Sequence, residues 1–79
     1  MSRTLYRLEG CPWCELVADK LKALDVDYES VWVEALHSKR NEVKRVSGQR
    51  GVPVFVDESQ GVTMAESERI NEYLETSYA

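Results

Sequence analysis

The sequence predicts a small α/β domain in which strands and helices follow the order β-α-β-α-β-β-α. The hydrophobic pattern changes from a strand-like to a helical period across residues 10–14. Further strand-like apolar runs, at residues 26–33 and 54–56, alternate with helical patterns. The length of 79 residues, with 43% hydrophobic and 30% charged residues, is typical of one globular domain. We therefore expect a single domain over residues 1–79.

The first third of the chain predicts a parallel strand pair joined by a helix. Residues 3–8 are rich in residue types that suit a pleated surface and should form the first strand. The helix is expected over residues 12–24, with an apolar stripe made of Val17, Leu21 and Leu24. Residues 26–33 predict the second strand. Because a helix connects these strands, they should pair in parallel with a right-handed crossover.

A short second helix is expected in the basic middle of the chain. Ser38 is a residue type that often caps helices, and the helical pattern runs from there to about Val46. Val43 and Val46 would lie on its apolar side. Ser47-Gly48 marks its end, because glycine commonly follows the last helical turn.

The remainder predicts a hairpin followed by a third helix. Residues 54–56 form a short apolar strand, residues 57–61 a turn, and residues 62–64 the returning strand. The third helix should run from about Glu66 to Glu75 or beyond. Its buried face would consist of Ile70, Tyr73 and Leu74.

The two cysteines lie where the first strand gives way to the first helix. Cys11 would be the capping residue, Pro12 suits the first helical turn, and Cys14 lies one turn further on. Unpaired N–H groups and the helix dipole at this position favour a thiolate over a thiol. We therefore expect Cys11 to be the nucleophile and Cys14 to be the thiol that resolves its mixed disulfide. Trp13 should be a partly exposed flank of this site.

A C-x-x-C motif has other interpretations. Zinc normally requires four ligands, and only His37 is left as a further nitrogen ligand, so we expect no metal site. His37 itself is expected to be an exposed loop residue. A purely structural disulfide across so short a loop would constrain the unfolded chain little. A redox-active dithiol beside a βαβ pattern is the interpretation that we favour.

The charges argue mildly against nucleic acid as a partner, because the net charge is −4. Residues 37–53 nevertheless carry five basic residues and one acid, and residues 54–79 carry six acids and one basic residue. These runs are either solvated helix faces or a basic lip for the carboxylates of a small anionic thiol.

No apolar run suggests a membrane segment or a leader, so we expect a cytoplasmic protein that keeps its cysteines in exchange between dithiol and disulfide.

Pro53, Glu66, Ser67 and Trp32 each have an ordinary structural interpretation beside a functional one. Pro53 opens a strand, where proline is tolerated, or it follows a cis peptide bond. The first N–H groups of the third helix could bind a carboxylate near Glu66 and Ser67, or these two residues simply cap that helix. Trp32 is expected to pack or to cover a sheet edge.

With these residues in view, the chain resembles a glutaredoxin of the thioredoxin-fold superfamily. The segment Cys11–Cys14 resembles the C-P-Y/W-C centre of that family, and Gly48–Pro53 resembles its G-Q/x-R-T-V-P segment. The resemblance implies that Pro53 is cis and faces the cysteines. It also implies a thioredoxin-like four-stranded mixed sheet in the order 2-1-3-4 with three helices.

The segment Met64–Ser67 is also similar to the N-terminal domain of glutathione transferases, where a Glu/Gln-Ser pair holds the γ-glutamyl end of glutathione. These resemblances imply a thiol-disulfide oxidoreductase that serves cell redox homeostasis with glutathione or γ-glutamylcysteine as co-substrate. It would have no permanently bound cofactor, would act on client proteins with disulfides, and would be a monomer. The residues implied to bind the thiol are Gln49, Arg50, Val52, Pro53, Glu66 and Ser67.

Two alternatives stay open at this point. One is a carrier that holds an iron–sulfur cluster between two protomers through Cys11 and two bound thiols. Pro12 counts against the carrier, because cluster-carrying relatives often have Gly or Ser there. The other is a redoxin reduced directly by thioredoxin reductase.

Overall fold

The computed structural model describes residues 2–79, and the predicted order of elements is confirmed. Two elements differ from expectation. The second strand is shorter than predicted, and a 3₁₀ helix, η1, precedes the second α-helix. The elements are β1 (Arg3–Arg7), α1 (Pro12–Ala23), β2 (Glu29–Trp32), η1 (His37–Lys39), α2 (Asn41–Ser47), β3 (Val54–Asp57), β4 (Val62–Ala65) and α3 (Ser67–Tyr78).

The four strands form one mixed sheet in the order β2-β1-β3-β4, as the resemblance implied. β1 and β2 are parallel, with Leu5 opposite Ser30. β3 lies antiparallel to β1 and places Phe55 opposite Leu5, and β4 pairs antiparallel with β3. This arrangement, with three α-helices, is the thioredoxin-like fold.

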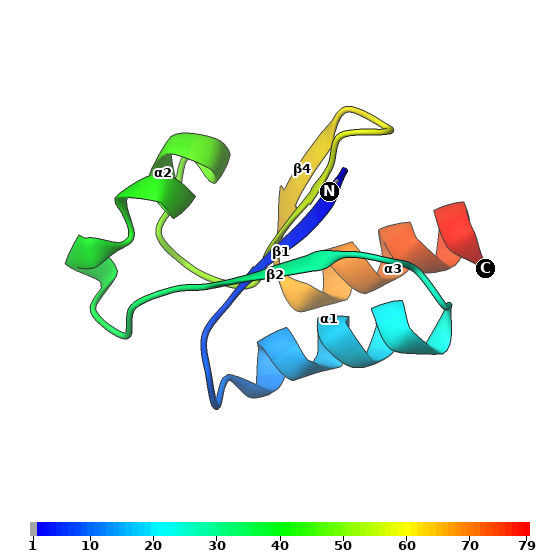
Figure 1. Ribbon diagram of the computed structural model, residues 1–79, viewed down its shortest axis with the longest axis horizontal. Coiled ribbons are helices and arrows are strands. Elements are labelled where there is room, and N and C mark those ends of the chain that lie inside the picture. Colours follow the sequence, from blue (N-terminus) through cyan, green and yellow to red (C-terminus); the bar gives the residue numbers. More distant parts are fainter. Residues whose placement is uncertain (1) are drawn as a thin grey trace.

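Helices cover the sheet unequally. α1 and α3 run side by side along one face, and α2 lies apart from them (Figure 1). The larger core cluster therefore forms between the sheet and the α1–α3 pair, from Leu5, Val17, Ala18, Leu21, Phe55, Ile70 and Leu74. A smaller cluster of Tyr6, Val43 and Val54 lies on the α2 side. None of the helices in the described part of the chain has the length and apolar character needed to cross a membrane.

The start of α2 corrects the sequence-based expectation. Ser38 does not cap this helix; it lies inside η1, and Arg40 occupies the position before the first residue of α2. The Arg40 side chain is buried and donates to the carbonyl oxygens of Glu34, Ala35 and Arg50 at 2.6, 3.1 and 3.0 Å. A hydrophobic pattern gives no signal for such a hydrogen-bonded cation. The predicted end is confirmed, because Gly48 has a φ of 83° after the last helical turn.

The strand register brings three distant segments to one end of the sheet. Tyr6 pairs with Val54, and Val54 pairs with Ala65. The loop that carries Cys11 follows β1 at this end, Pro53 immediately precedes β3 there, and Glu66 immediately follows β4. The fold therefore gathers at one edge the three segments that the sequence analysis singled out.

Candidate redox site

Cys11 is the N-cap residue of α1, as predicted. Its backbone is extended, with φ −86° and ψ 111°, and Pro12 is the first residue of the helix. The Cys11 Sγ accepts a hydrogen bond from the backbone N–H of Cys14 at 3.2 Å. This contact uses one of the N–H groups that a helix start leaves unpaired. Cys11 is partly exposed, so a disulfide can approach it from solvent.

Cys14 lies in a different environment although it is only one turn away. Its side chain is completely buried. Burial raises the pKa of the Cys14 thiol to about 12, with a further contribution from its hydrogen bond to Cys11. A backbone contact with Leu8 and the positive charge of Arg7 act in the opposite direction and lower that pKa. The motif therefore combines one accessible sulfur with one protected thiol.

Exposed apolar side chains lie beside the cysteines. Trp13 is 60% exposed, as expected for a flank of the site, and Leu16 on the next turn is also exposed. Trp32 covers the sheet edge, where its ring lies 4.4 Å from the Arg7 guanidinium carbon. Two broad apolar side chains thus stand at the end of the sheet where the cysteines lie.

Arg7 is the site-proximal residue that the sequence analysis missed. It ends β1, is 7% exposed, and forms an ion pair with Glu15 at 2.7 Å. The available signal was a basic residue at the end of an apolar strand, with an acid placed just after the second cysteine. Neither residue by itself predicts that Arg7 forms an ion pair with the first turn of α1.

The Val52-Pro53 peptide bond is cis, which confirms what the resemblance implied. Pro53 is buried immediately before β3, next to Val54, the residue that pairs with Tyr6. Among residues 2–79 no group of three or more His, Cys, Asp and Glu side chains could hold a metal ion.

Two of the residues implied to bind a thiol share one cavity. Gln49 and Glu66 both line a polar hollow of about 250 Å³. The remaining lining residues are Ser47, Thr63, Met64, Ala65 and Arg69. Glu66 has a φ of 75° at the N-cap of α3, and no side-chain capping bond from it forms within the described residues. Its carboxylate instead lies 3.9 Å from Arg69, and Ser67 begins the helix.

Arg50 does not line this cavity, although Gln49 before it does. The guanidinium of Arg50 donates to Asn41 Oδ1 at 2.9 Å and to the His37 carbonyl oxygen at 3.3 Å. It thereby ties the loop before β3 to the η1–α2 segment. His37 is exposed, as expected, although it begins η1 instead of lying in a loop. Val52 is half-buried beside Pro53.

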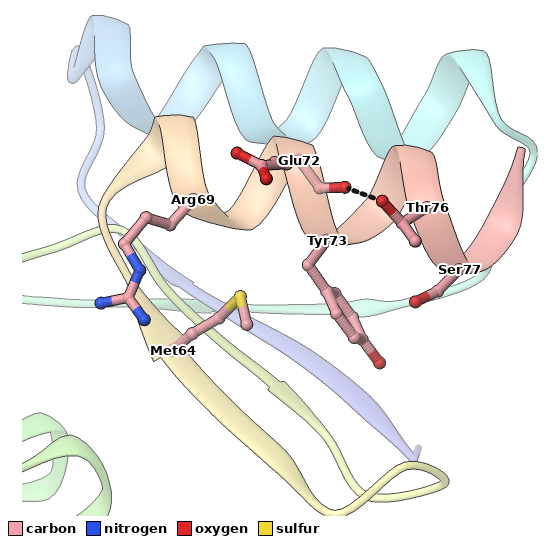
Figure 2. A pocket seen from close by; sticks show the side chains of 6 residues that line it. All are labelled: Met64, Arg69, Glu72, Tyr73, Thr76 and Ser77. Atoms are coloured by element: carbon pink, nitrogen blue, oxygen red, sulfur yellow. Dashed lines mark hydrogen bonds between the residues drawn. The ribbon is translucent and has the colours of Figure 1, made fainter.

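A further cavity adjoins the hollow that Gln49 and Glu66 line, because Met64 and Arg69 line both. It measures about 300 Å³ and is open to solvent between β4 and α3. Figure 2 shows Met64 of β4 below the helix, with Arg69 and Tyr73 extending from α3 toward the strand. None of the sequence-predicted site residues is among the six that line it. We therefore place the candidate site at the cysteines and not in this further cavity.

Comparisons with known proteins agree with the fold. The family model described as glutathione S-transferase, N-terminal domain, matches residues 5–79. An uncharacterized glutaredoxin-like 8.6 kDa protein from the rubredoxin operon of Clostridium pasteurianum is 35% identical over 51 residues. The match covers 65% of this chain and 68% of that protein.

Solved structures give the same result. Glutathione transferase E6 from Drosophila melanogaster is 32% identical, with a TM-score of 0.86 over 98% of this chain. A glutathione transferase homologue from Drosophila mojavensis, solved with bound glutathione, is 25% identical with a TM-score of 0.85 over 98% of this chain. In each case the present chain covers 35% of the transferase. The similarity is therefore to one part of those longer proteins.

Proposed function

This chain belongs to the family of glutathione S-transferase N-terminal domains and has a glutaredoxin-like relative, and we propose that it acts as a dithiol glutaredoxin. The observation that carries the proposal is the asymmetry of the two sulfurs. Cys11 is accessible and accepts an N–H bond at the helix start, and Cys14 is buried one turn away. Attack and resolution need these two environments.

The proposed cycle begins at Cys11. Its thiolate attacks one sulfur of a substrate disulfide, a new S–S bond forms, and the other sulfur leaves as a thiolate. Cys14 then loses its proton to solvent and attacks Cys11, which releases the second substrate thiolate and leaves a Cys11–Cys14 disulfide. Alternatively, an incoming low-molecular-weight thiol attacks the mixed disulfide directly. Two molecules of such a thiol return the oxidised protein to the dithiol, and they are oxidised to a disulfide.

The thiol is proposed to be glutathione or γ-glutamylcysteine. Gln49 and Glu66 share a polar cavity, and the homologue from Drosophila mojavensis was solved with bound glutathione. The Glu66 carboxylate would face the α-ammonium group, and Ser67 would meet the α-carboxylate at the start of α3. Val52 would pair with the peptide of the thiol as an added strand, and the positive charge of Arg50 would attract a carboxylate of the thiol. Client proteins with disulfides would dock on the same edge.

Reduction of a small mixed disulfide tests this function. Wild-type protein would be assayed with glutathione and with γ-glutamylcysteine as separate electron donors, beside Cys11→Ser and Cys14→Ser. We expect turnover with at least one donor, no turnover in Cys11→Ser, and retained turnover in Cys14→Ser, because the thiol can resolve the mixed disulfide by itself.

A folded protein with both thiols free that turns over with neither donor would contradict the proposal. That result would favour a redoxin reduced by thioredoxin reductase. This alternative can be assayed directly by adding thioredoxin reductase and its nicotinamide reductant to the protein. Equal loss in the two cysteine variants would contradict the division of labour between the sulfurs.

A further inference from the structure

Arg69 lines the polar hollow that Gln49 and Glu66 share, although no motif in the sequence pointed to it. It belongs to the first turn of α3, three residues after Glu66. Figure 2 shows its side chain extending from the helix toward β4. Met64 and Arg69 also line the adjoining cavity, so Arg69 stands where the two hollows meet.

The polar hollow contains one charge of each sign. Its lining residues include one acid, Glu66, and one base, Arg69, and all the others are neutral. A ligand with a single charge would leave one of these two side chains without a partner. A ligand that holds a positive and a negative group close together would match both. The end of an α-amino acid, with its ammonium and its carboxylate on one carbon, has this arrangement.

The ion pair between Glu66 and Arg69 can open for such a ligand at little cost. The two side chains are 73% and 69% exposed, and their nearest charged atoms are 3.9 Å apart, which is longer than a hydrogen bond. Exposed pairs of this kind contribute little to stability. Glu66 also makes no side-chain capping bond within the described residues, so its carboxylate is not committed to the start of α3. An inserted ammonium and carboxylate would replace one long contact with two charge-assisted hydrogen bonds.

We propose that Arg69 is a specificity-determining residue of the thiol site: it binds the α-carboxylate of a γ-glutamyl group, and Glu66 binds the α-ammonium on the same carbon. The inference rests on the proposed glutaredoxin function and restricts its thiol to those that end in a free α-amino acid. Ser67 would add a neutral contact to the same carboxylate at the start of α3. Glutathione and γ-glutamylcysteine both carry this end, so the pair of charges selects the class of thiol.

Three cysteine derivatives test the two charges separately. γ-Glutamylcysteine carries both the α-ammonium and the α-carboxylate of the glutamyl group. Glutarylcysteine lacks that ammonium, γ-aminobutyrylcysteine lacks that carboxylate, and all three keep the carboxylate of cysteine. Reduction of a small mixed disulfide would be measured with each thiol as the electron donor, and KM and kcat would be determined. The variants are Arg69→Met, Arg69→Lys and Glu66→Gln.

The matched controls are Arg45→Met and Glu42→Gln in α2. Glu42 and Arg45 are also exposed, and they form an ion pair with the same spacing in the sequence and the same distance of 3.9 Å. Neither residue lines the polar hollow. We expect both control variants to match wild type with all three thiols.

We expect Arg69→Met to raise the KM for γ-glutamylcysteine and for glutarylcysteine at least about fivefold, because the carboxylate of each loses a charged partner. The kcat should change little, because binding is weakened and the exchange between sulfurs is not. The KM for γ-aminobutyrylcysteine should not rise, since this thiol has no carboxylate for Arg69 to bind. Arg69→Lys should lie between wild type and Arg69→Met, because it keeps the charge and loses the planar fork of donors.

Glu66→Gln should give the opposite selectivity. Its KM should rise for the two thiols that carry the ammonium, γ-glutamylcysteine and γ-aminobutyrylcysteine, and should not rise for glutarylcysteine. An equal rise for all three thiols in Arg69→Met would overturn the inference, because it would indicate a general change at the start of α3. An unchanged KM for γ-glutamylcysteine in that variant would overturn it as well.

These outcomes are separable from failure of the proposed function. If wild type turns over with γ-glutamylcysteine and the Arg69 variants resemble it, the function stands and this inference fails. If wild type turns over with none of the three thiols and not with glutathione, the function itself fails. Should Arg69→Met not fold, as judged by circular dichroism, Arg69→Gln takes its place with the same expected pattern and the same contradicting results.

Discussion

Cys11 and Cys14 illustrate how position within one helical turn separates two identical side chains. Cys11 stands outside the first turn, accepts the Cys14 N–H and stays partly exposed. Cys14 faces the interior, where burial and the neighbouring sulfur raise its pKa to about 12. Burial protects the second thiol from oxidants in solvent. The disulfide that we propose it forms with Cys11 would require no large movement, because the Cys14 N–H already contacts the Cys11 sulfur.

Asp57 is a second residue whose environment defines its role, in this case structural. It is fully buried at the end of β3 and accepts hydrogen bonds from Ser59 Oγ at 2.5 Å, from the Tyr73 hydroxyl at 2.8 Å and from the Tyr78 hydroxyl. The carboxylate thereby joins the β3–β4 turn to the last turns of α3. Burial by itself raises the pKa of Asp57, but the hydrogen bonds from Ser59, Tyr78 and Tyr73 outweigh it, so the pKa lies below its ordinary value.

Asp57→Asn should lower the free energy of unfolding by about 1–3 kcal/mol at neutral pH, because donors that faced a carboxylate lose their charged acceptor. The pKa of Asp57 is lower in the folded state than in the unfolded state, so its stabilisation is present above the unfolded pKa of about 4 and is lost as pH falls through the folded value. Urea unfolding at neutral and acid pH measures both effects. Wild type should lose more stability between the two conditions than Asp57→Asn.

Glu58→Gln is the matched control for Asp57, since Glu58 is exposed on the same turn. It should leave the unfolding free energy within about 0.5 kcal/mol of wild type, as surface changes usually do. If Asp57→Asn were as stable as this control at neutral pH, the carboxylate would not be the anchor of α3.

At the scale of elements, α2 is fixed in place mainly by the hydrogen bonds of Arg40, because its own contacts with the core are few. The helix has seven residues and only Val43 is buried in it. Such a short helix gains little from its own backbone cooperativity. Arg40 compensates by donating to three carbonyl oxygens on both sides of the helix, from Glu34 and Ala35 before it and from Arg50 after it. It also removes one cation from the basic surface that the sequence suggested.

Arg40→Met should therefore loosen the whole η1–α2 segment. We expect faster amide hydrogen exchange across residues 34–50 and a loss of about 1–3 kcal/mol in unfolding free energy, because three backbone carbonyl groups lose their charged donor. If the segment also positions Gln49 and Arg50 for the thiol, the KM for the thiol should rise several-fold with little change in kcat. Lys44→Met, an exposed cation of the same helix, should change neither measurement, and unchanged exchange in Arg40→Met would contradict this account.

At the scale of the molecule, periodicity predicted the order of the elements and the place of the cysteines. Local patterns were sufficient there because strands and helices differ in the period of their apolar residues, as the change around residues 10–14 shows. The cis Val52-Pro53 bond and the sheet order were implied only by family resemblance, and the structure agrees with both. A single sequence contains no local signal for either feature, since both depend on contacts between distant segments.

The features that could not be predicted are polar contacts over long sequence separations. Arg7 meets Glu15, Tyr28 and Trp32, and Asp57 meets Tyr78, although no repeating spacing links these residues. Charged side chains are usually exposed, so the sequence gives no sign that Arg7 and Asp57 are buried. In the folded chain both side chains are buried, because each forms hydrogen bonds or ion pairs with residues that the hydrophobic pattern does not point to.

The measurement that tests the central claim most directly is the position of a trapped mixed disulfide. Reduced Cys14→Ser and Cys11→Ser would each be exposed briefly to oxidised glutathione, and mass spectrometry with peptide mapping would locate the adduct. The account predicts rapid glutathionylation of Cys11 in Cys14→Ser and almost none of the buried Cys14 in Cys11→Ser over the same time. Equal modification of both variants would contradict it, because the two sulfurs would then be equally reactive.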